Sequence, residues 1–265
     1  MTPVEVVSGN GPIVLGLPHT GTHVPEGVRE RLNDLGRGLD DTDWHIERLY
    51  GDLLNDVTAV RATFHRYVID ANRDPSGVSL YPGQNTTGLV PLTDFDGKPI
   101  WSTPPVDDEI EARRIAWHAP YHAALKAELE RVRAIHGVAI LYDCHSIRSN
   151  IPFLFDGALP DFNIGTNLGT TCDAKITSAV QEICTAATGY TSITNGRFKG
   201  GWTTRHYGQP KHGTHAIQME LAQSTYLTAE SAPWTYDDAR ADALRQHLKE
   251  ILMALKARAL SGELS

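Results

Sequence analysis

Histidines stand at two points of the sequence where buried strands are expected to end. His19 follows the apolar run PIVLGL, and His145 closes the run VAILYDCHS. Between them lies the acidic segment DDTDWH. A catalytic zinc ion usually takes three protein ligands from His, Asp, Glu or Cys and keeps a fourth position for water. The two histidines and one aspartate of DDTDWH therefore form a candidate zinc site, with Asp143 as a partner for the ring of His145.

A structural interpretation of the same residues is also open. His19 would then cap a turn, DDTD would begin a helix, and His145 would be a hydrogen-bonded residue at the end of a strand. Two further histidines, His118 and His122, are four residues apart and would share one helix face. Pro120 lies between them, which favours packing over metal binding. Packing is also favoured for the histidines of the turns HTGTH and KHGTH, namely His23, His212 and His215.

Charged side chains that suit an acidic substrate occur at other predicted strand ends. Glu220 lies near the end of the apolar run HAIQMELA, where an ionisable group needs a partner or a chemical role. Arg73, Arg148 and Arg205 lie where strands give way to loops. A guanidinium group is the preferred partner of a carboxylate, so these arginines are candidate substrate ligands. The alternative for each is an ordinary surface or salt-bridged arginine.

Hydrophobic periodicity predicts the elements that must position these residues. The predicted strands cover residues 12–17, 57–70, 138–146 and 215–222. The predicted helices cover residues 42–55, 107–135 with an interruption at Pro120, 171–188 and 237–260. Alternating helices and continuous apolar strands indicate an α/β sheet covered on both faces. In such sheets ligands bind at the carboxyl ends of the strands, where PHTG, YDCHS and QMEL would converge.

Composition restricts the remaining possibilities. The 265 residues include 41% hydrophobic and 21% charged residues, as expected for one globular domain spanning residues 1–265. Residues 74–106 are rich in turn-forming residues and are predicted to form a long loop that serves as an active-site lid. A net charge of -8 argues against nucleic-acid binding. Three separated cysteines and the lack of a long apolar stretch predict free thiols and a soluble cytoplasmic protein without membrane contact.

Several strings of the sequence resemble the N-formylglutamate amidohydrolase family, in order and over about residues 10–230. They are LPHTGTHVP, DDTDWHIERLY, VIDANRDPSG, WHAPYHAAL, YDCHSIRS, DFNIGTNLGTTC and HAIQMELAQSTYL. The resemblance implies a three-layer α/β/α fold with a mixed, mostly parallel sheet. This fold is similar to that of the zinc carboxypeptidases and aspartoacylases, which is also called phosphorylase/hydrolase-like.

The resemblance also implies a metal-ligand set. His19 and His145 match metal-binding histidines, and Asp43 takes the place of the carboxylate that carboxypeptidases hold in an H-x-x-E motif. Position 22 is Thr and not Glu, so the sequence departs from that motif and Asp41 remains a rival ligand. Glu220 matches the general-base glutamate of the family.

The substrate ligands are assigned in the same way. Arg73 and Asn72 match the Asn-Arg pair that binds a substrate carboxylate. Arg148 and Arg205 are our own candidates for a second carboxylate.

The activity implied by the resemblance is hydrolysis of N-formyl-L-glutamate to formate and L-glutamate, a step of histidine degradation. It implies a divalent metal, with zinc expected, and a small-molecule substrate. One alternative is a related amidase for another N-acyl amino acid, or a carboxypeptidase-like hydrolase, with the same metal site. A second alternative is a non-catalytic amino-acid-binding protein on the same fold.

Overall fold

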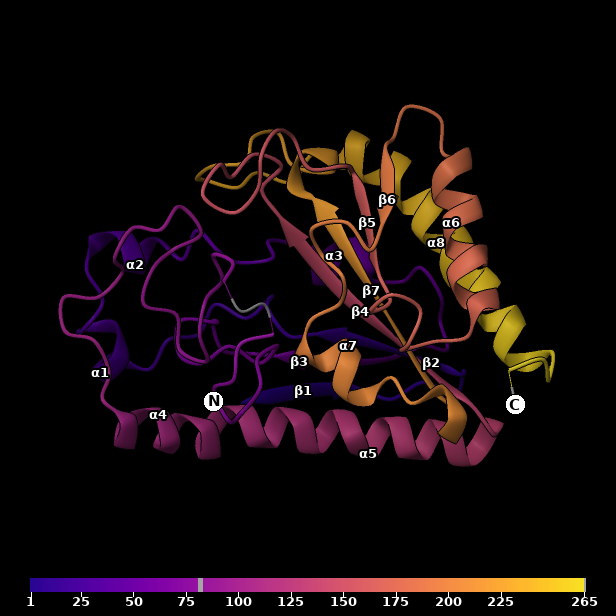
Figure 1. The fold of residues 1–265 in the computed structure, drawn as a ribbon, viewed down its shortest axis with the longest axis horizontal. Coiled ribbons are helices and arrows are strands. Elements are labelled where there is room, and N and C mark those ends of the chain that lie inside the picture. Colours follow the sequence, from indigo (N-terminus) through magenta and orange to yellow (C-terminus); the bar gives the residue numbers. More distant parts are fainter. Residues whose placement is uncertain (81–82, 265) are drawn as a thin grey trace.

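A mixed seven-stranded sheet forms the centre of the molecule (Figure 1). The computed structural model describes residues 1–80 and 83–264. Within them the strand order is β1-β3-β2-β4-β7-β5-β6, and four of the six neighbouring pairs are parallel. The strands are β1 (Val4–Val7), β2 (Ile13–Leu17), β3 (Thr58–Ala62), β4 (Ala139–Ile147), β5 (Phe162–Gly165), β6 (Ser192–Thr194) and β7 (Thr214–Ala222). The predicted mixed, mostly parallel sheet is confirmed.

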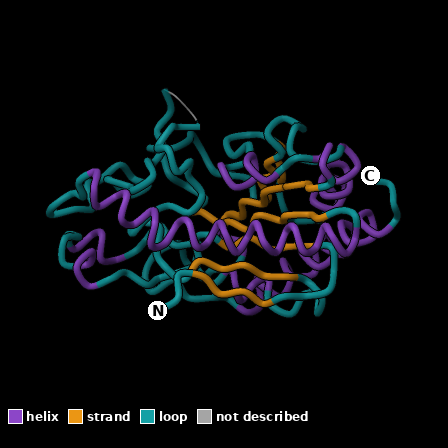
Figure 2. Tube along the Cα trace, turned by 90° about the horizontal axis from the view of Figure 1, so that it is seen from below, coloured by secondary structure: helices purple, strands orange, loops and turns teal. Residues whose placement is uncertain are grey.

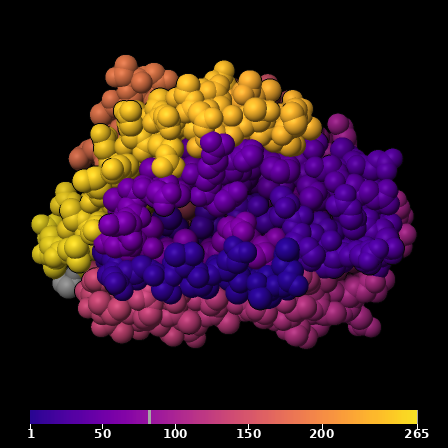
Figure 3. Space-filling model, turned by 180° about the vertical axis from the view of Figure 1, so that it is seen from behind, coloured from indigo at the N-terminus to yellow at the C-terminus, as the bar shows by residue number. Residues whose placement is uncertain are grey.

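Helices cover both faces of this sheet. The long helix α5 runs across β1, β2, β3 and β4 on one face, whereas α3, α6 and α8 pack on the other (Figures 1 and 2). Seen from behind, the N-terminal residues lie between α5 and the C-terminal helix (Figure 3). The helices are α1 (Glu26–Arg29), α2 (Asp34–Gly38), α3 (Ile46–Tyr50), α4 (Asp107–Arg113), α5 (Ala119–His136), α6 (Ala174–Ala186), α7 (Trp202–Tyr207) and α8 (Asp238–Leu260).

The central strands divide their side chains between two hydrophobic cores. In β4, Leu141 belongs to the core under α5, and its neighbour Tyr142 belongs to the core under α3, α6 and α8. Both side chains are completely buried. Successive residues of a strand point to opposite faces, so a strand covered on both sides has a continuous apolar sequence. Because β2, β4 and β7 are buried on both faces, their sequences are apolar runs that can be identified as strands from the sequence alone.

The helix predicted over residues 42–55 begins too early and ends too late. Only α3, Ile46–Tyr50, is helical in that range. The preceding residue His45 has a left-handed backbone with φ 60°, and the N–H of Asp43 donates to the carbonyl of His19 at 3.1 Å. This turn directs Asp43 towards the carboxyl ends of the strands. Tertiary hydrogen bonding therefore overrides the helical spacing of the apolar residues.

Other predicted elements differ in detail. The predicted strand over 57–70 is limited to β3, and the residues after it form turns. A π-helical turn, Arg114–His118, joins α4 to α5 just before Pro120. Residues 81 and 82 of the predicted loop 74–106 lie outside the described residues, and its described part contains isolated bridges but no helix or strand. The lid role and the single-domain interpretation remain predictions.

Two smaller predictions also bear on the fold. All three cysteines are free and buried, as expected. No helix in the described part of the chain is both long enough and apolar enough to cross a membrane.

The packing of α8 predicts a contrast between two adjacent residues. Both residues belong to α8, but Leu252 is completely buried, whereas Met253 is 53% exposed. Leu252→Ala should lower the free energy of unfolding by about 2–5 kcal/mol, because it removes buried methyl groups and leaves a cavity. Met253→Ala should change that free energy by less than about 0.5 kcal/mol. Urea unfolding of both variants checks this, and equal losses would contradict the packing described here.

Candidate active site

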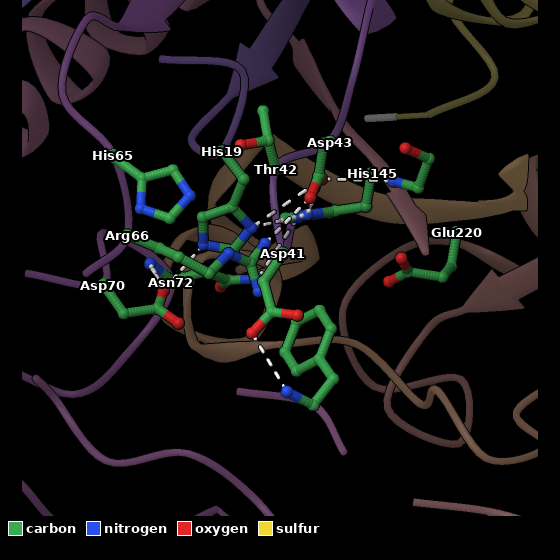
Figure 4. A network of polar contacts seen from close by, with 12 residues as sticks. His19, Asp41, Thr42, Asp43, His65, Arg66, Asp70, Asn72, His145 and Glu220 are labelled. Atoms are coloured by element: carbon green, nitrogen blue, oxygen red, sulfur yellow. Dashed lines mark hydrogen bonds and ion pairs between the residues drawn. The ribbon is translucent and has the colours of Figure 1, made fainter. Parts of the chain in front are cut away.

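Three buried side chains bring their ligand atoms together at the carboxyl ends of the strands. They are His19 after β2, Asp43 in the turn before α3, and His145 in β4, and their atoms lie within 4.8 Å of one another. Nδ1 of His19 and Nδ1 of His145 are 3.2 Å apart. Oδ2 of Asp43 is 3.2 Å from Nδ1 of His145 and 3.8 Å from Nδ1 of His19. Figure 4 shows the two rings and the carboxylate facing one another.

These separations fit one metal ion. Nitrogen and oxygen ligands bind zinc at about 2.0–2.1 Å, so neighbouring corners of a tetrahedron lie about 3.4 Å apart. The three measured separations, 3.2, 3.2 and 3.8 Å, lie around that value. The donor set of two imidazoles and one carboxylate is also one that zinc accepts.

The opposite nitrogen of each ring faces a buried carboxylate. Nε2 of His19 lies 2.7 Å from Oδ1 of Asp70, and Nε2 of His145 lies 3.1 Å from Oδ1 of Asp143. A carboxylate accepts hydrogen bonds, so the contact with Asp70 favours the hydrogen on Nε2 of His19 and a lone pair on its Nδ1. Asp143 lies at ion-pair distance from His145, and its Oδ1 accepts no hydrogen bond from the described residues. Nδ1 of His19, Nδ1 of His145 and Oδ2 of Asp43 face one position, and two neutral imidazoles with one carboxylate are ligands that a metal ion accepts, so the residues fit a metal ion.

Asp43 is held in its ionised form by its surroundings. Its other oxygen, Oδ1, accepts a hydrogen bond from Arg66 at 2.8 Å, and Oδ2 accepts one from the N–H of Ser146 at 3.1 Å. Burial alone raises the pKa of Asp43, but Arg66 and the two histidines hold that pKa well below its usual range. Burial lowers the pKa of His145, but Asp143 and Asp43 hold it well above its usual range.

Asp41, the rival ligand, makes other contacts. Its Oδ2 accepts hydrogen bonds from the hydroxyl of Tyr67 at 2.7 Å and from the N–H of Phe95 at 3.0 Å. In Figure 4 its carboxylate points away from the rings. Burial raises the pKa of Asp41 to about 7, and its hydrogen bond with Tyr67 opposes this rise. The structure therefore groups Asp43, and not Asp41, with the histidines.

Glu220 lies beside this group on the neighbouring strand. It is paired in register with His145 in the parallel ladder of β4 and β7. Gln218, two residues earlier on the same strand, donates to Oε2 of Glu220 at 3.0 Å. Burial raises the pKa of Glu220 to about 8, while His145 opposes the rise and Asp43 adds to it. A raised pKa near neutrality suits a group that accepts a proton and then returns it.

The start of α7 fixes Asn72 above His145. The N–H of Thr203 donates to the side-chain oxygen of Asn72 at 2.9 Å, and the side-chain nitrogen lies 3.2 Å from Nε2 of His145. A Cβ at Gly201 would lie 2.3 Å from that nitrogen, so a side chain there would displace the amide of Asn72. Thr204 donates to Oδ2 of Asp143 at 2.8 Å. One short helix thus orients two partners of the histidine.

A cleft opens over these residues. The empty space in it, including the open mouth, is about 650 Å³. Glu220 and both histidines line it, and the described part of the 74–106 segment supplies part of its wall. The arginines in the lining are Arg66, Arg73 and Arg197.

The two other predicted substrate arginines have different surroundings. Arg148 pairs with Asp96 at 3.1 Å, and Arg205 donates to the carbonyl of Gly200 at 2.8 Å. Neither of these two described residues belongs to the cleft lining.

His118 and His122 contact backbone carbonyls, as the packing interpretation predicts. His122 lies 2.8 Å from the carbonyl of Ala71, and His118 lies 3.1 Å from the carbonyl of Arg73, both through Nε2. Their rings are 4.4 Å apart. Burial lowers the pKa of His122 to about 3, so its ring is neutral. These two histidines hold the segment that carries Asn72 and Arg73.

Sequence reasoning missed three residues of this site. Asp70 supports His19, Arg66 binds Asp43, and Arg197 lines the cleft. Arg66 lies within the predicted strand 57–70 and Asp70 ends it, and that position was the available signal for them. Arg197 lies in a loop without hydrophobic periodicity, so the sequence offered no comparable signal.

Comparison with protein families adds to this geometry. Residues 11–227 match the family described as N-formylglutamate amidohydrolase. This chain belongs to the N-formylglutamate amidohydrolase family. The match includes all three members of the ligand group and Glu220. The expected family resemblance is therefore confirmed.

Relatives and solved structures agree with this membership. The chain is 44% identical over 261 residues to the N-formylglutamate deformylase of Pseudomonas aeruginosa, covering 96% of this chain and 97% of the relative. It is 46% identical to that of Pseudomonas putida, covering 94% of each chain. The crystal structure of N-formylglutamate amidohydrolase from Ralstonia eutropha superposes with a TM-score of 0.80 at 25% identity, covering 97% and 99% of the two chains. A protein of Agrobacterium tumefaciens shares the fold, with a TM-score of 0.74, 17% identity and coverage of 97% and 96%.

The different surroundings of Asp43 and Asp41 predict different effects on metal binding. Asp43→Asn removes the charged ligand. It should weaken metal binding by more than the ~10–100-fold that is typical when a residue that only supports a metal ligand is replaced. Asp41→Asn should retain the metal, because its carboxylate contacts Tyr67 and Phe95 instead. Metal titration of the two purified variants, each checked by circular dichroism, measures this difference. Loss of metal from the Asp41 variant alone would assign the ligand to Asp41.

Proposed function

We propose that this chain hydrolyses N-formyl-L-glutamate to formate and L-glutamate. The observation that carries the proposal is the joint location of a two-histidine, one-aspartate group and Glu220 in one arginine-lined cleft. Such a group suits hydrolysis, and the arginines suit a substrate with two carboxylates. The names of the two Pseudomonas relatives, at 44% and 46% identity, support the same substrate.

The proposed cofactor is a divalent metal, with zinc as the expected ion. His19, Asp43 and His145 would hold it, and Asp70 and Asp143 would keep the rings oriented. When bound, such an ion supplies Lewis-acid chemistry, because it lowers the pKa of water towards neutrality and polarises a carbonyl group. The chain itself supplies proton transfer and substrate positioning.

Glu220 is the proposed general base. It accepts a proton from the water that attacks the formyl carbon, and it then gives the proton to the nitrogen of the departing glutamate. Because an amine leaves as a neutral group only when its nitrogen is protonated, one carboxyl group serves both steps. The hydrogen bond from Gln218 to Oε2 keeps the side chain of Glu220 in place.

Arg73 and Asn72 are the proposed ligands of a substrate carboxylate. Asn72 contacts His145, and Arg73 follows it directly in the cleft lining. The guanidinium of Arg73 is oriented by Thr87, through Nε to the carbonyl at 2.9 Å and through Nη2 to Oγ1 at 2.8 Å. A fixed guanidinium group binds a carboxylate with less loss of side-chain entropy.

Formate release tests the proposed activity. The purified chain should release formate from N-formyl-L-glutamate faster than from N-formyl-L-aspartate or N-acetyl-L-aspartate. Removal of metal by a chelator should abolish turnover, and added zinc or a similar ion should restore it. Preferred cleavage of an N-acetyl substrate or a peptide would indicate a related amidase or a carboxypeptidase-like enzyme. Binding without turnover by metal-loaded protein would indicate an amino-acid-binding protein.

The role of Glu220 predicts a separate result. Glu220→Gln keeps the size of the side chain but removes its ability to accept a proton. The variant should lower kcat by at least about a hundredfold, since general-base catalysis typically contributes ~10²–10⁴. Metal content and KM should stay near those of the parent, because Glu220 lies beside the ligand group and not in it. Normal turnover, or loss of the metal, would contradict this role.

A further inference from the structure

We infer that Arg197 binds the side-chain carboxylate of the substrate and so selects acidic formylamino acids. This inference rests on the proposed function and names the group that recognises the far end of its substrate. Arg197 takes the role that sequence reasoning gave to Arg148 and Arg205.

Arg197 is already oriented in the cleft. It lies between β6 and α7 and lines the cleft together with Phe198. Its Nε donates to the carbonyl of Leu154 at 2.9 Å, and its Nη2 donates to the carbonyl of Asn85 at 3.0 Å. The guanidinium carbon lies 5.5 Å from the centre of the Phe198 ring. These hydrogen bonds fix the plane of the guanidinium group.

Arg197 and Arg73 hold the same segment of the cleft wall. Arg73 bonds to Thr87, and Arg197 bonds to the carbonyl of Asn85, two residues earlier. Two residues of extended chain span at most about 7 Å. The two arginines are therefore anchored on one short stretch of the cleft wall, which suits a single small substrate that carries two carboxylates.

The contacts of each arginine decide which carboxylate it receives. Arg73 follows Asn72, which contacts His145, and its Nη1 lies 3.6 Å from Asp70, the partner of His19. Arg73 is thus linked directly to the residues around the reacting centre. Arg197 is linked instead to the outer loops at Asn85 and Leu154. The α-carboxylate is nearer to the formyl group than the side-chain carboxylate is. Arg73 therefore binds the α-carboxylate, and Arg197 binds the side-chain carboxylate.

Arg66, the third arginine of the lining, has another task. It donates to Oδ1 of Asp43 at 2.8 Å and is almost fully buried. The side chain of Arg66 is thus nearly inaccessible, whereas Arg73 and Arg197 are partly exposed in the lining and can share the two substrate carboxylates.

Paired substrates test the inference in the metal-loaded enzyme. N-formyl-L-glutamine replaces the side-chain carboxylate of N-formyl-L-glutamate by a neutral amide of the same shape. Arg197→Gln should lower kcat/KM for N-formyl-L-glutamate about 10- to 100-fold, since it removes a charge-assisted contact. The same variant should change kcat/KM for N-formyl-L-glutamine less than about threefold. Arg197→Lys should also lower the preference for N-formyl-L-glutamate over N-formyl-L-glutamine, but by a smaller factor. Lysine keeps the positive charge but lacks the two-pronged geometry of the guanidinium group.

Two further variants are matched controls. Arg73→Gln should reduce kcat/KM for both substrates by the same factor, because both keep the α-carboxylate. Arg114→Gln, which removes an arginine paired with Glu111 on the helix surface, should change neither value. Metal content and circular dichroism accompany each variant.

The outcomes separate this inference from the proposed function. One outcome is an active parent enzyme with Arg197 variants that show the same fall in kcat/KM for both substrates, or no fall at all. That result would overturn the role of Arg197 alone. If Arg197→Gln does not fold, an unchanged substrate preference in Arg197→Lys overturns the role as well. A metal-loaded parent that releases no formate from N-formyl-L-glutamate would overturn the proposed function and this inference together.

Discussion

The site depends on three ligand atoms that meet at one buried position. Nδ1 of His19, Nδ1 of His145 and Oδ2 of Asp43 approach to 3.2–3.8 Å, and a buried carboxylate lies beside the far nitrogen of each ring. Arg66 pairs with the buried carboxylate of Asp43, and Nη1 of Arg73 lies 3.6 Å from Asp70. Buried charges are costly unless paired, and a divalent cation would add a positive charge beside Asp43.

The topology of the sheet explains how distant residues meet this requirement. β2, β4 and β7 are neighbouring parallel strands, so their carboxyl ends lie at one edge and bring His19, His145 and Glu220 together. The parallel pairing of β4 with β7 places His145 and Glu220 opposite each other on adjacent strands. The ligand from outside these strands, Asp43, needs a special turn, which the left-handed residue His45 completes. The active site is thus a consequence of strand order and one irregular connection.

The difference between regular strands and irregular connections also explains how much of the site could be predicted from the sequence. The positions of His19 and His145 followed from apolar runs, because strands buried on both faces are recognisable without any structure. Asp43 could be chosen over Asp41 only through a family resemblance, since the path of a turn depends on tertiary hydrogen bonds. The role of Arg197 needed the structure, because its partners Asn85 and Leu154 are distant in sequence. The hydrophobic pattern therefore predicted the strands of the sheet and the edge at which the candidate ligands lie. It did not predict the loops that complete the cleft.

The metal environment provides the most direct measurement of this account. X-ray absorption at the zinc edge of the zinc-loaded protein reports the ligand atoms and their distances without any assay of turnover. The account predicts two imidazole nitrogens at about 2.0–2.1 Å, oxygen from one carboxylate, and no sulfur ligand. A sulfur ligand, a single imidazole, or zinc bound only by exposed surface groups would contradict the site formed by His19, Asp43 and His145.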